Sequence, residues 1–251
     1  MRSIDLNCDM GESFGAWTMG NDRAILRYVS SANIACGFHA GDPSTIAETV
    51  ALAIEAGVAV GAHPSYPDIQ GFGRREMSLS PKEIRDGVVY QVSALKGICE
   101  SLGGRLHHVK PHGALYNRAA RDSEAAKAIA DAAAAVDGGL FVYGLSGGEL
   151  VSAAESAGLR TASEVFADRN YMSDGTLTPR SRPDALITSS EEAAARALSM
   201  ARDGEIESVE GSNVKVRSET ICIHGDGPDA LEFARAIRAA LDTAGIEVKA
   251  P

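Results

Sequence analysis

SIDLNCDMGE, residues 3–12, is a short apolar run that ends in carboxylate and amide side chains. Similar runs return along the chain, and Ala-rich segments with apolar residues at helical spacing separate them. Strands that alternate with helices pair in parallel through right-handed crossovers. The alternation therefore predicts an α/β fold with a parallel sheet. The runs that we predict as strands are 3–8, 32–36, 58–62, 108–110, 140–143, 161–165, 185–188 and 220–223.

Capping residues mark the boundaries of the predicted helices. Asp42 stands directly before Pro43, and Ser80 begins a capping box that Glu83 completes. Residues 229–244 carry apolar side chains at every third or fourth position, as expected for a helix on the outer wall of a barrel. Glycines that we interpret as C-terminal caps follow four helical segments: Gly57, Gly103, Gly158 and Gly245.

The chain carries no sign of a division into domains. It has no internal repeat and no low-complexity linker, and a barrel of parallel strands commonly occupies about this length. Residues 204–219 are polar with alternating Val, which predicts a small hairpin before the last strand. We therefore predict a single barrel domain over residues 1–251.

Composition excludes several classes of function. The formal net charge is -10, and an acidic surface repels phosphate backbones, so we expect no nucleic-acid partner. No run of about 18 apolar residues is present, so we expect no membrane span. The first ten residues lack the basic start and apolar core of a signal peptide. The four Cys form no CxxC pair and are interpreted as buried thiols. Together these features predict a cytoplasmic protein.

Polar side chains follow nearly every predicted strand. In a parallel barrel all strand carboxyl ends open on one face, where active sites are built. Five of the six His are therefore expected at one rim, whereas His107 precedes the fourth strand and is interpreted as structural. The other polar residues at these ends include Asn7, Asp9, Glu12, Lys110, Asn117, Glu164, Asp168, Arg169 and Asp226.

Some of these positions allow more than one interpretation. Glu164 lies inside a strand-like run, where an unpaired carboxylate is costly, so we expect it to pair with Lys110 or Arg169. Asp9 and Glu12 suit acid/base groups, metal ligands or helix-capping carboxylates. GFGRR, residues 71–75, suits either an anion-binding loop or a solvated basic turn.

Seven sequence blocks resemble the signature blocks of the LamB/YcsF family. They lie in the expected order, run from Asp5 to Asp226 and depart nowhere clearly from the family pattern at the polar positions. The blocks are DLNCDMGES, NIACGFHAGDP, GAHPSYPD, GFGRR, VKPHGALYN, SEVFADRNY and ICIHGD.

The resemblance implies an incomplete TIM-like (β/α)7 barrel, related to the glycoside hydrolase and polysaccharide deacetylase barrels. It implies 5-oxoprolinase activity, in which the cyclic amide 5-oxoproline is opened to L-glutamate with ATP as co-substrate, and two partner subunits, B and C. The expected catalytic residues are Asp9, His39, His63, Lys110, His112 and Glu164. The expected substrate-binding residues are Asn7, Glu12, Arg74, Asn117, Asp168, Arg169, His224 and Asp226.

Two other functions stay open at this point. A metal-dependent deacetylase or amidohydrolase of the related barrel class would use Asp9, His39 and His63 as ligands of a divalent metal with an open position. The second open function is that of a non-catalytic binding or scaffolding protein. The sequence contains no P-loop, dinucleotide fingerprint or nucleophile elbow, so it indicates neither where ATP binds nor a serine-hydrolase mechanism.

Overall fold

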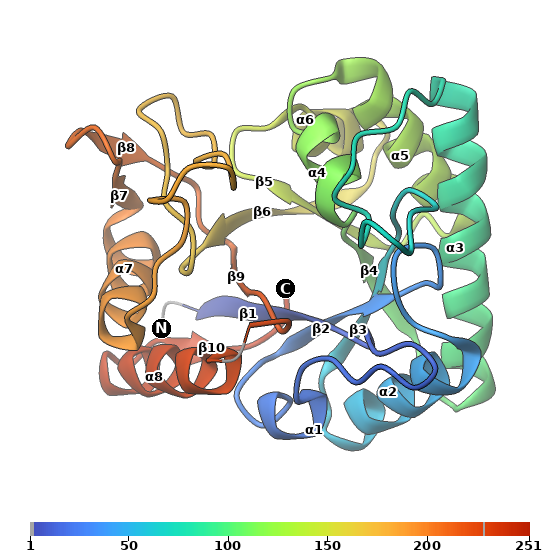
Figure 1. The fold of residues 1–251 in the computed structure, drawn as a ribbon, viewed down its shortest axis with the longest axis horizontal. Helices are drawn as coiled ribbons and strands as arrows, with labels where there is room; N and C mark the ends of the chain where they lie inside the picture. The colour runs from blue at the N-terminus through green and yellow to red at the C-terminus, as the bar shows by residue number, and fades with distance from the viewer. Residues whose placement is uncertain (1–2, 228) are drawn as a thin grey trace.

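A closed ring of parallel strands forms the centre of the molecule (Figure 1). The computed structural model describes residues 3–227 and 229–251. Strand β1 (Ser3–Met10) pairs with β2 (Ser31–Ala35) at one edge and with β9 (Thr220–Ile223) at the other, which closes the ring. The remaining strands of the ring are β3 (Ala59–His63), β4 (Leu106–Val109), β5 (Phe141–Leu145) and β6 (Arg160–Phe166). Within the described residues this ring has seven strands, which confirms the predicted (β/α)7 barrel.

Helices surround the ring on its outer side (Figure 1). Asp42 accepts from the backbone N–H groups of Ser44 and Thr45, and Ser80 and Glu83 form both bonds of the capping box, so the two predicted helix starts are confirmed. All four predicted capping glycines have positive φ. The helices are α1 (Asp22–Ile25), α2 (Pro43–Glu55), α3 (Pro81–Ser101), α4 (Gly113–Ala119), α5 (Ser123–Val136), α6 (Glu149–Ser156), α7 (Ser190–Asp203) and α8 (Ala230–Thr243).

The segment between β6 and β9 departs from the prediction. The expected hairpin is present as the antiparallel strands β7 (Glu205–Glu207) and β8 (Asn213–Lys215). The predicted strand at 185–188 is wrong, because this stretch lies in a long loop, residues 167–189, that we call the mouth loop (Figure 1). Within residues 185–188 the β-type pairing is an isolated antiparallel bridge between Leu186 and Arg169. A short strand that the sequence did not indicate, β10 (Glu247–Val248), pairs with the start of β1.

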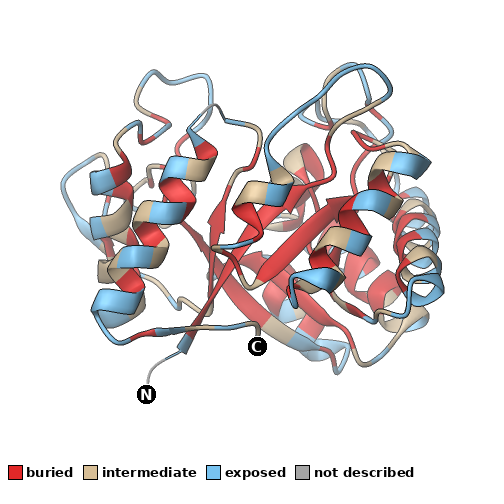
Figure 2. Cartoon of the chain, turned by 90° about the horizontal axis from the view of Figure 1, so that it is seen from below, coloured by how far each residue is buried: buried red, intermediate tan, exposed pale blue. Residues whose placement is uncertain are grey.

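The two faces of the ring differ in polarity. In β1 the side chains of Leu6 and Cys8 belong to the apolar core between strands and helices, whereas Asp5 and Asn7 point into the ring and hydrogen-bond to Thr220 on the neighbouring strand β9. Figure 2 shows the strands buried along their length and the helices buried on one face only. All four Cys are free and buried, as predicted. In the described part of the chain, no helix combines the length and apolarity that crossing a membrane requires.

Candidate functional site

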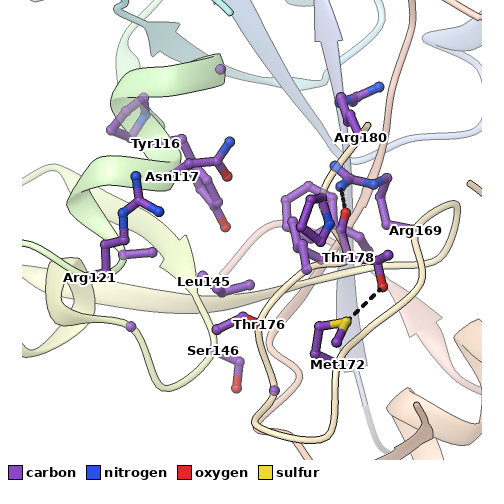
Figure 3. A pocket seen from close by; sticks show the side chains of 18 of the residues that line it. Tyr116, Asn117, Arg121, Leu145, Ser146, Arg169, Met172, Thr176, Thr178 and Arg180 are labelled. Atoms are coloured by element: carbon purple, nitrogen blue, oxygen red, sulfur yellow. Dashed lines mark hydrogen bonds between the residues drawn. The ribbon is translucent and has the colours of Figure 1, made fainter. Parts of the chain in front are cut away.

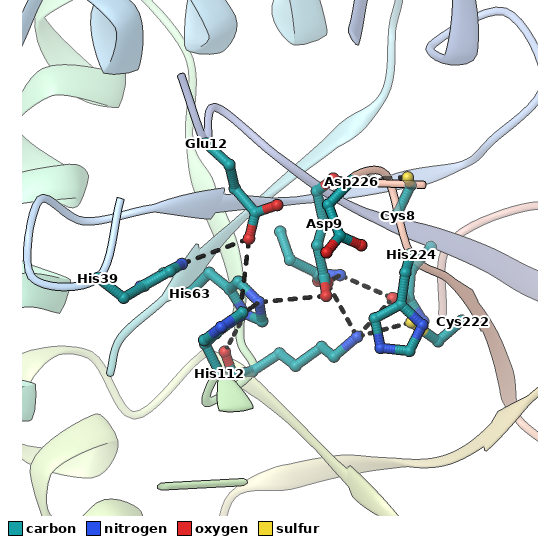
Figure 4. Close-up of polar contacts among 12 residues, drawn as sticks. Cys8, Asp9, Glu12, His39, His63, His112, Cys222, His224 and Asp226 are labelled. Atoms are coloured by element: carbon teal, nitrogen blue, oxygen red, sulfur yellow. Dashed lines mark hydrogen bonds and ion pairs between the residues drawn. The ribbon is translucent and has the colours of Figure 1, made fainter. Parts of the chain in front are cut away.

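The polar residues that follow the strands do meet at the carboxyl end of the ring. Glu12 lies in the loop after β1, His39 in the loop after β2, and His63 is the last residue of β3. Because successive strand residues point to opposite faces, the inward positions of each strand reach the same opening. Figure 4 shows how these side chains converge. The group consists of Asp9, Glu12, His39, His63, Lys110, His112, Glu164, Cys222 and His224.

Lys110 is the centre of a buried charged cluster. Its Nζ lies 2.8 Å from Glu164 Oε1 and 3.0 Å from Asp9 Oδ1, and it also donates to Asn7 Oδ1 at 3.1 Å. Burial opposes the charged form of Lys110, but Asp9, Cys222 and Glu164 outweigh burial and hold its pKa well above the usual value. Of the two partners expected for Glu164, the structure therefore selects Lys110.

Asparagines hold this cluster in place from inside the barrel. Asn7 Nδ2 donates to Glu164 Oε1 at 2.9 Å and to Thr220 Oγ1 at 2.6 Å. Asn33 Nδ2 donates to Asn7 Oδ1 at 2.7 Å and to Asp9 Oδ1 at 2.9 Å. Asn7 therefore hydrogen-bonds two charged groups of this cluster, Glu164 and Lys110. Asn33 was missed by sequence reasoning, although its place on the inward face of β2 follows from strand alternation.

His108 corrects the expectation that five His lie at the rim. It lies on β4, two positions before Lys110, which directly follows the strand, so His108 lies one layer deeper in the ring. Its ring stacks on Tyr143 with centroids 4.1 Å apart, and its Nε2 lies 2.8 Å from Asn33 Oδ1. His108 is thus part of the support beneath the mouth. His107, interpreted as structural, is half-buried and lies beside it.

A second cluster contains three imidazoles and one carboxylate. His63 Nε2 and His112 Nδ1 lie 3.0 Å apart, and Glu12 Oε1 lies 3.6 Å from His112 Nδ1 and 3.4 Å from His39 Nε2. Burial lowers the pKa of His39 and of His112 well below the usual value. Burial, and then the nearby Asp9, raise the pKa of Glu12. One nitrogen or oxygen atom from each of the four residues lies within 4.8 Å of the others, so the cluster could hold a metal ion.

A cavity of about 760 Å³ opens above both clusters. Figure 3 shows Asn117 and Arg121 on the side of α4 and Arg169, Thr178 and Arg180 on the side of the mouth loop. Guanidinium groups gather here although the whole chain is acidic, so the cavity favours an anionic ligand over a cationic one.

The predicted substrate-binding residues divide into two groups. At the rim, Arg74 Nη2 pairs with Asp226 Oδ2 at 2.6 Å, and His224 Nδ1 pairs with Asp168 Oδ2 at 2.6 Å. His224 Nε2 lies 3.1 Å from Arg180 Nη2, a contact that the sequence did not indicate.

Arg169 lines the cavity, but its guanidinium donates to the backbone carbonyls of Thr178, at 2.6 Å, and Ala185, at 3.3 Å. Arg169 therefore fastens the mouth loop, and it does not pair with Glu164. Burial lowers the pKa of Arg169 to about 10. In the GFGRR stretch only Arg74 lines the cavity, because Arg75 pairs with Asp68.

Comparison with known proteins agrees with this architecture. The model of the LamB/YcsF family matches residues 4–251. A protein of Bordetella pertussis that is named as the A subunit of 5-oxoprolinase is 60% identical over 248 residues, which cover 99% of this chain and 98% of the relative. A protein of the same name from Bacillus subtilis is 58% identical over 250 residues, which cover 100% and 97%.

The crystal structure of a lactam utilization protein from Thermus thermophilus has the same fold, with a TM-score of 0.94 at 53% identity. The match covers 99% of this chain and 100% of that chain. The family model matches almost all residues of the chain, and the relatives at 58–60% identity lead to the same family. The chain therefore belongs to the LamB/YcsF family.

Proposed function

We propose that this chain acts as the A subunit of an ATP-dependent 5-oxoprolinase, which opens 5-oxoproline to L-glutamate. The names of its relatives from Bordetella pertussis and Bacillus subtilis support this assignment. In this proposal the chain is a single barrel domain, works in the cytoplasm with subunits B and C, and uses ATP as the co-substrate of the assembled enzyme.

The observation that carries the proposal is the position of Lys110, fully buried between Asp9 and Glu164 at the floor of the cavity. A lactam is a resonance-stabilised amide and a poor electrophile. Phosphorylation of its oxygen by ATP, with release of ADP, makes the ring carbon electrophilic, so that water can add there and the ring nitrogen can leave as it takes up a proton. The acyl phosphate of glutamate that results then reacts with a second water, which releases phosphate and gives glutamate. Such a step needs a cation that faces developing negative charge and groups that move protons.

The residues at the mouth suit these requirements. Lys110 would stabilise the developing charge, while Asp9, Glu164 and the imidazoles of His39, His63 and His112 would position water and move protons. Arg74, Asn117 and His224 border the cavity and would contact the substrate carboxylate or the phosphoryl group. Asn7, Glu12, Asp168 and Asp226 would act through the charged groups that they hold, and Arg169 would act through the mouth loop.

The test is 5-oxoproline-dependent release of ADP, measured first with the pure chain and then with subunits B and C added. We expect little or no turnover by the chain alone and full turnover in the complex. Robust ATP-dependent turnover by the isolated chain contradicts the assignment of ATP chemistry to the assembled complex. An active complex that is unaffected by omission of this chain contradicts the proposal as a whole.

A second candidate is a metal-dependent amidohydrolase or deacetylase, and the cluster of Glu12, His39, His63 and His112 favours it. Such an enzyme would carry a divalent metal and hydrolyse an amide without ATP. Amide hydrolysis by the metal-loaded chain in the absence of ATP supports this candidate, whereas strict dependence on ATP and the partner subunits supports the first.

A further inference from the structure

Two imidazole nitrogens, His63 Nε2 and His112 Nδ1, face each other at 3.0 Å. His63 Nδ1 lies 2.7 Å from the backbone carbonyl oxygen of Lys110, and His112 Nε2 lies 2.9 Å from that of Phe72. A carbonyl oxygen only accepts, so each of these nitrogens carries the hydrogen of its ring. In neutral rings the other nitrogens, His63 Nε2 and His112 Nδ1, then present lone pairs to each other across 3.0 Å. Two acceptors at this distance need a positive charge beside them, which either a metal ion or a second proton on one ring supplies.

Glu12 brings a carboxyl group to the same place. Its side chain is buried, and in the described part of the chain its hydrogen bond and ion pairs go to His39 and His112. Asp9 Oδ1 accepts from Lys110 and Asn33, while Asp9 Oδ2 lies 3.3 Å from His63 Nε2. Burial disfavours the ionised form of this carboxyl group, and a divalent cation bound beside it would favour that form.

The distances in this group match those of ligands around a small metal ion. Ligand atoms at about 2.0–2.2 Å from a tetrahedral ion lie about 3.3–3.6 Å from one another. Of the six separations among the four atoms, two are 3.4 Å and 3.6 Å, a third is shorter at 3.0 Å, and all six lie within 4.8 Å. Metal-binding His residues commonly donate their second ring N–H to a backbone carbonyl, as His63 and His112 do.

We propose that Glu12, His39, His63 and His112 bind one divalent transition-metal ion, with Zn²⁺ as the type that the donors favour. Three imidazoles and one carboxylate suit Zn²⁺, whereas Mg²⁺ and Ca²⁺ prefer oxygen ligands alone. These ligands differ from the Asp9, His39 and His63 expected from the sequence. Asp9 pairs with Lys110 instead, and Glu12 and His112 are added as ligands. The site lies beside the charged cluster of Lys110, because Asp9 Oδ2 of that cluster is 3.3 Å from His63 Nε2 (Figure 4).

Phe72 supports the site from the backbone. It has φ of +53°, and it is the one non-glycine residue with positive φ among residues 3–227 and 229–251. This conformation is unfavourable for a residue with a side chain. In this conformation the backbone carbonyl of Phe72 accepts the hydrogen bond from His112 Nε2. The strained residue therefore helps to orient a proposed metal ligand.

The test uses the full chain, stripped of metal by a chelator and then titrated with Zn²⁺ by calorimetry and with Co²⁺ by visible absorption. We expect one ion per chain, d–d bands typical of tetrahedral Co²⁺, and a higher melting temperature with Zn²⁺. Because loss of an outer partner already costs about 10–100-fold in metal affinity, His63→Gln and His112→Gln should each cost about 100-fold or more. The control is His107→Gln, which removes an imidazole outside the site and should leave the affinity unchanged.

Circular dichroism checks that each variant is folded, and Glu12→Gln replaces any His variant that is not. Absence of saturable binding, or binding that none of these substitutions weakens, overturns the proposal. Doubly protonated imidazolium at His63 or His112, seen by ¹⁵N NMR in the presence of excess Zn²⁺, also overturns it, because a proton then supplies the positive charge. The assay contains neither ATP nor 5-oxoproline, so its outcome is independent of the proposed function.

Discussion

Lys110 Nζ and Glu164 Oε1 lie 2.8 Å apart, and both side chains are buried at the floor of the mouth. Removing one member of a buried pair leaves the other charge without compensation. Lys110→Met should therefore lower the free energy of unfolding by about 3–5 kcal/mol. Denaturant unfolding of the isolated chain measures this loss.

The double variant Lys110→Met/Glu164→Gln shows how much of this loss of stability comes from the unpaired carboxylate of Glu164. It removes both charges, so part of the lost stability should return, although Asp9 still lacks its lysine partner. A double variant as unstable as Lys110→Met alone contradicts the view that Glu164 is the main carboxylate left uncompensated.

Gly73→Ala tests the close approach of the backbone to the imidazoles. Gly73 has φ of +63°, and a Cβ there would meet Ser65 Oγ, His39 Cβ at 2.8 Å and His112 Cδ2 at 3.0 Å. We expect a loss of about 1–2 kcal/mol from the left-handed backbone and about 1–3 kcal/mol more from the clash. Turnover of the assembled complex should fall as well.

The matched control for this substitution is Gly57→Ala. Gly57 has φ of +70°, and nothing lies within 4 Å of its added Cβ, so only the backbone strain remains. Equal losses of stability in the two variants contradict a role for the close approach at Gly73.

Asp42 predicts a pH dependence of stability. Backbone hydrogen bonds from Gly15 and Thr45 lower its pKa to about 2 in the folded chain. Because the folded pKa lies below the unfolded value of about 3.9, the stabilisation is present above about pH 4 and is lost as the pH falls through about 2. The difference in melting temperature between the wild type and Asp42→Asn should therefore shrink from pH 5 to pH 2. A difference that stays constant over this range contradicts the prediction.

Arg180 is expected to bind the anionic substrate. Its Nη2 contacts His224 Nε2 at the cavity wall, and none of its recorded hydrogen bonds or ion pairs in the described chain involves a carboxylate. A hydrogen bond to a charged group contributes about 1.5–3 kcal/mol, so Arg180→Gln should raise KM for 5-oxoproline by about 10–100-fold and change kcat less. Arg85→Gln on the outer helix α3 is the control. An unchanged KM places the substrate carboxylate elsewhere.

Much of the site was predictable because its positions follow from local pattern. Asp9, His63 and Lys110 lie at strand ends, and parallel pairing brings such ends to one face whatever the details of packing. Strand alternation also predicts that Asn33 and Cys222 lie on the inward face of the ring. The depth of His108 depends on which layer of the barrel each inward residue occupies, and strand register sets that layer.

The mouth loop was not predictable by the same means. Residues 185–188 have strand-like composition, but Ala185 and Ile187 are buried in a loop whose path depends on Arg169 and its distant carbonyl partners. The pairing of Glu164 was open for the same reason, because the choice between Lys110 and Arg169 depends on where the loop takes the guanidinium. Contacts between residues far apart in sequence decide both questions.

Turnover of Lys110→Met in the complex with subunits B and C tests the central claim most directly, at a temperature where the variant is folded. If Lys110 stabilises charge that develops during ring opening, kcat for 5-oxoproline-dependent ADP release should fall by about 100-fold or more. The double variant Lys110→Met/Glu164→Gln should stay equally inactive although its stability partly returns. Recovery of turnover in the double variant would contradict the account, because Lys110 would then serve only to neutralise Glu164.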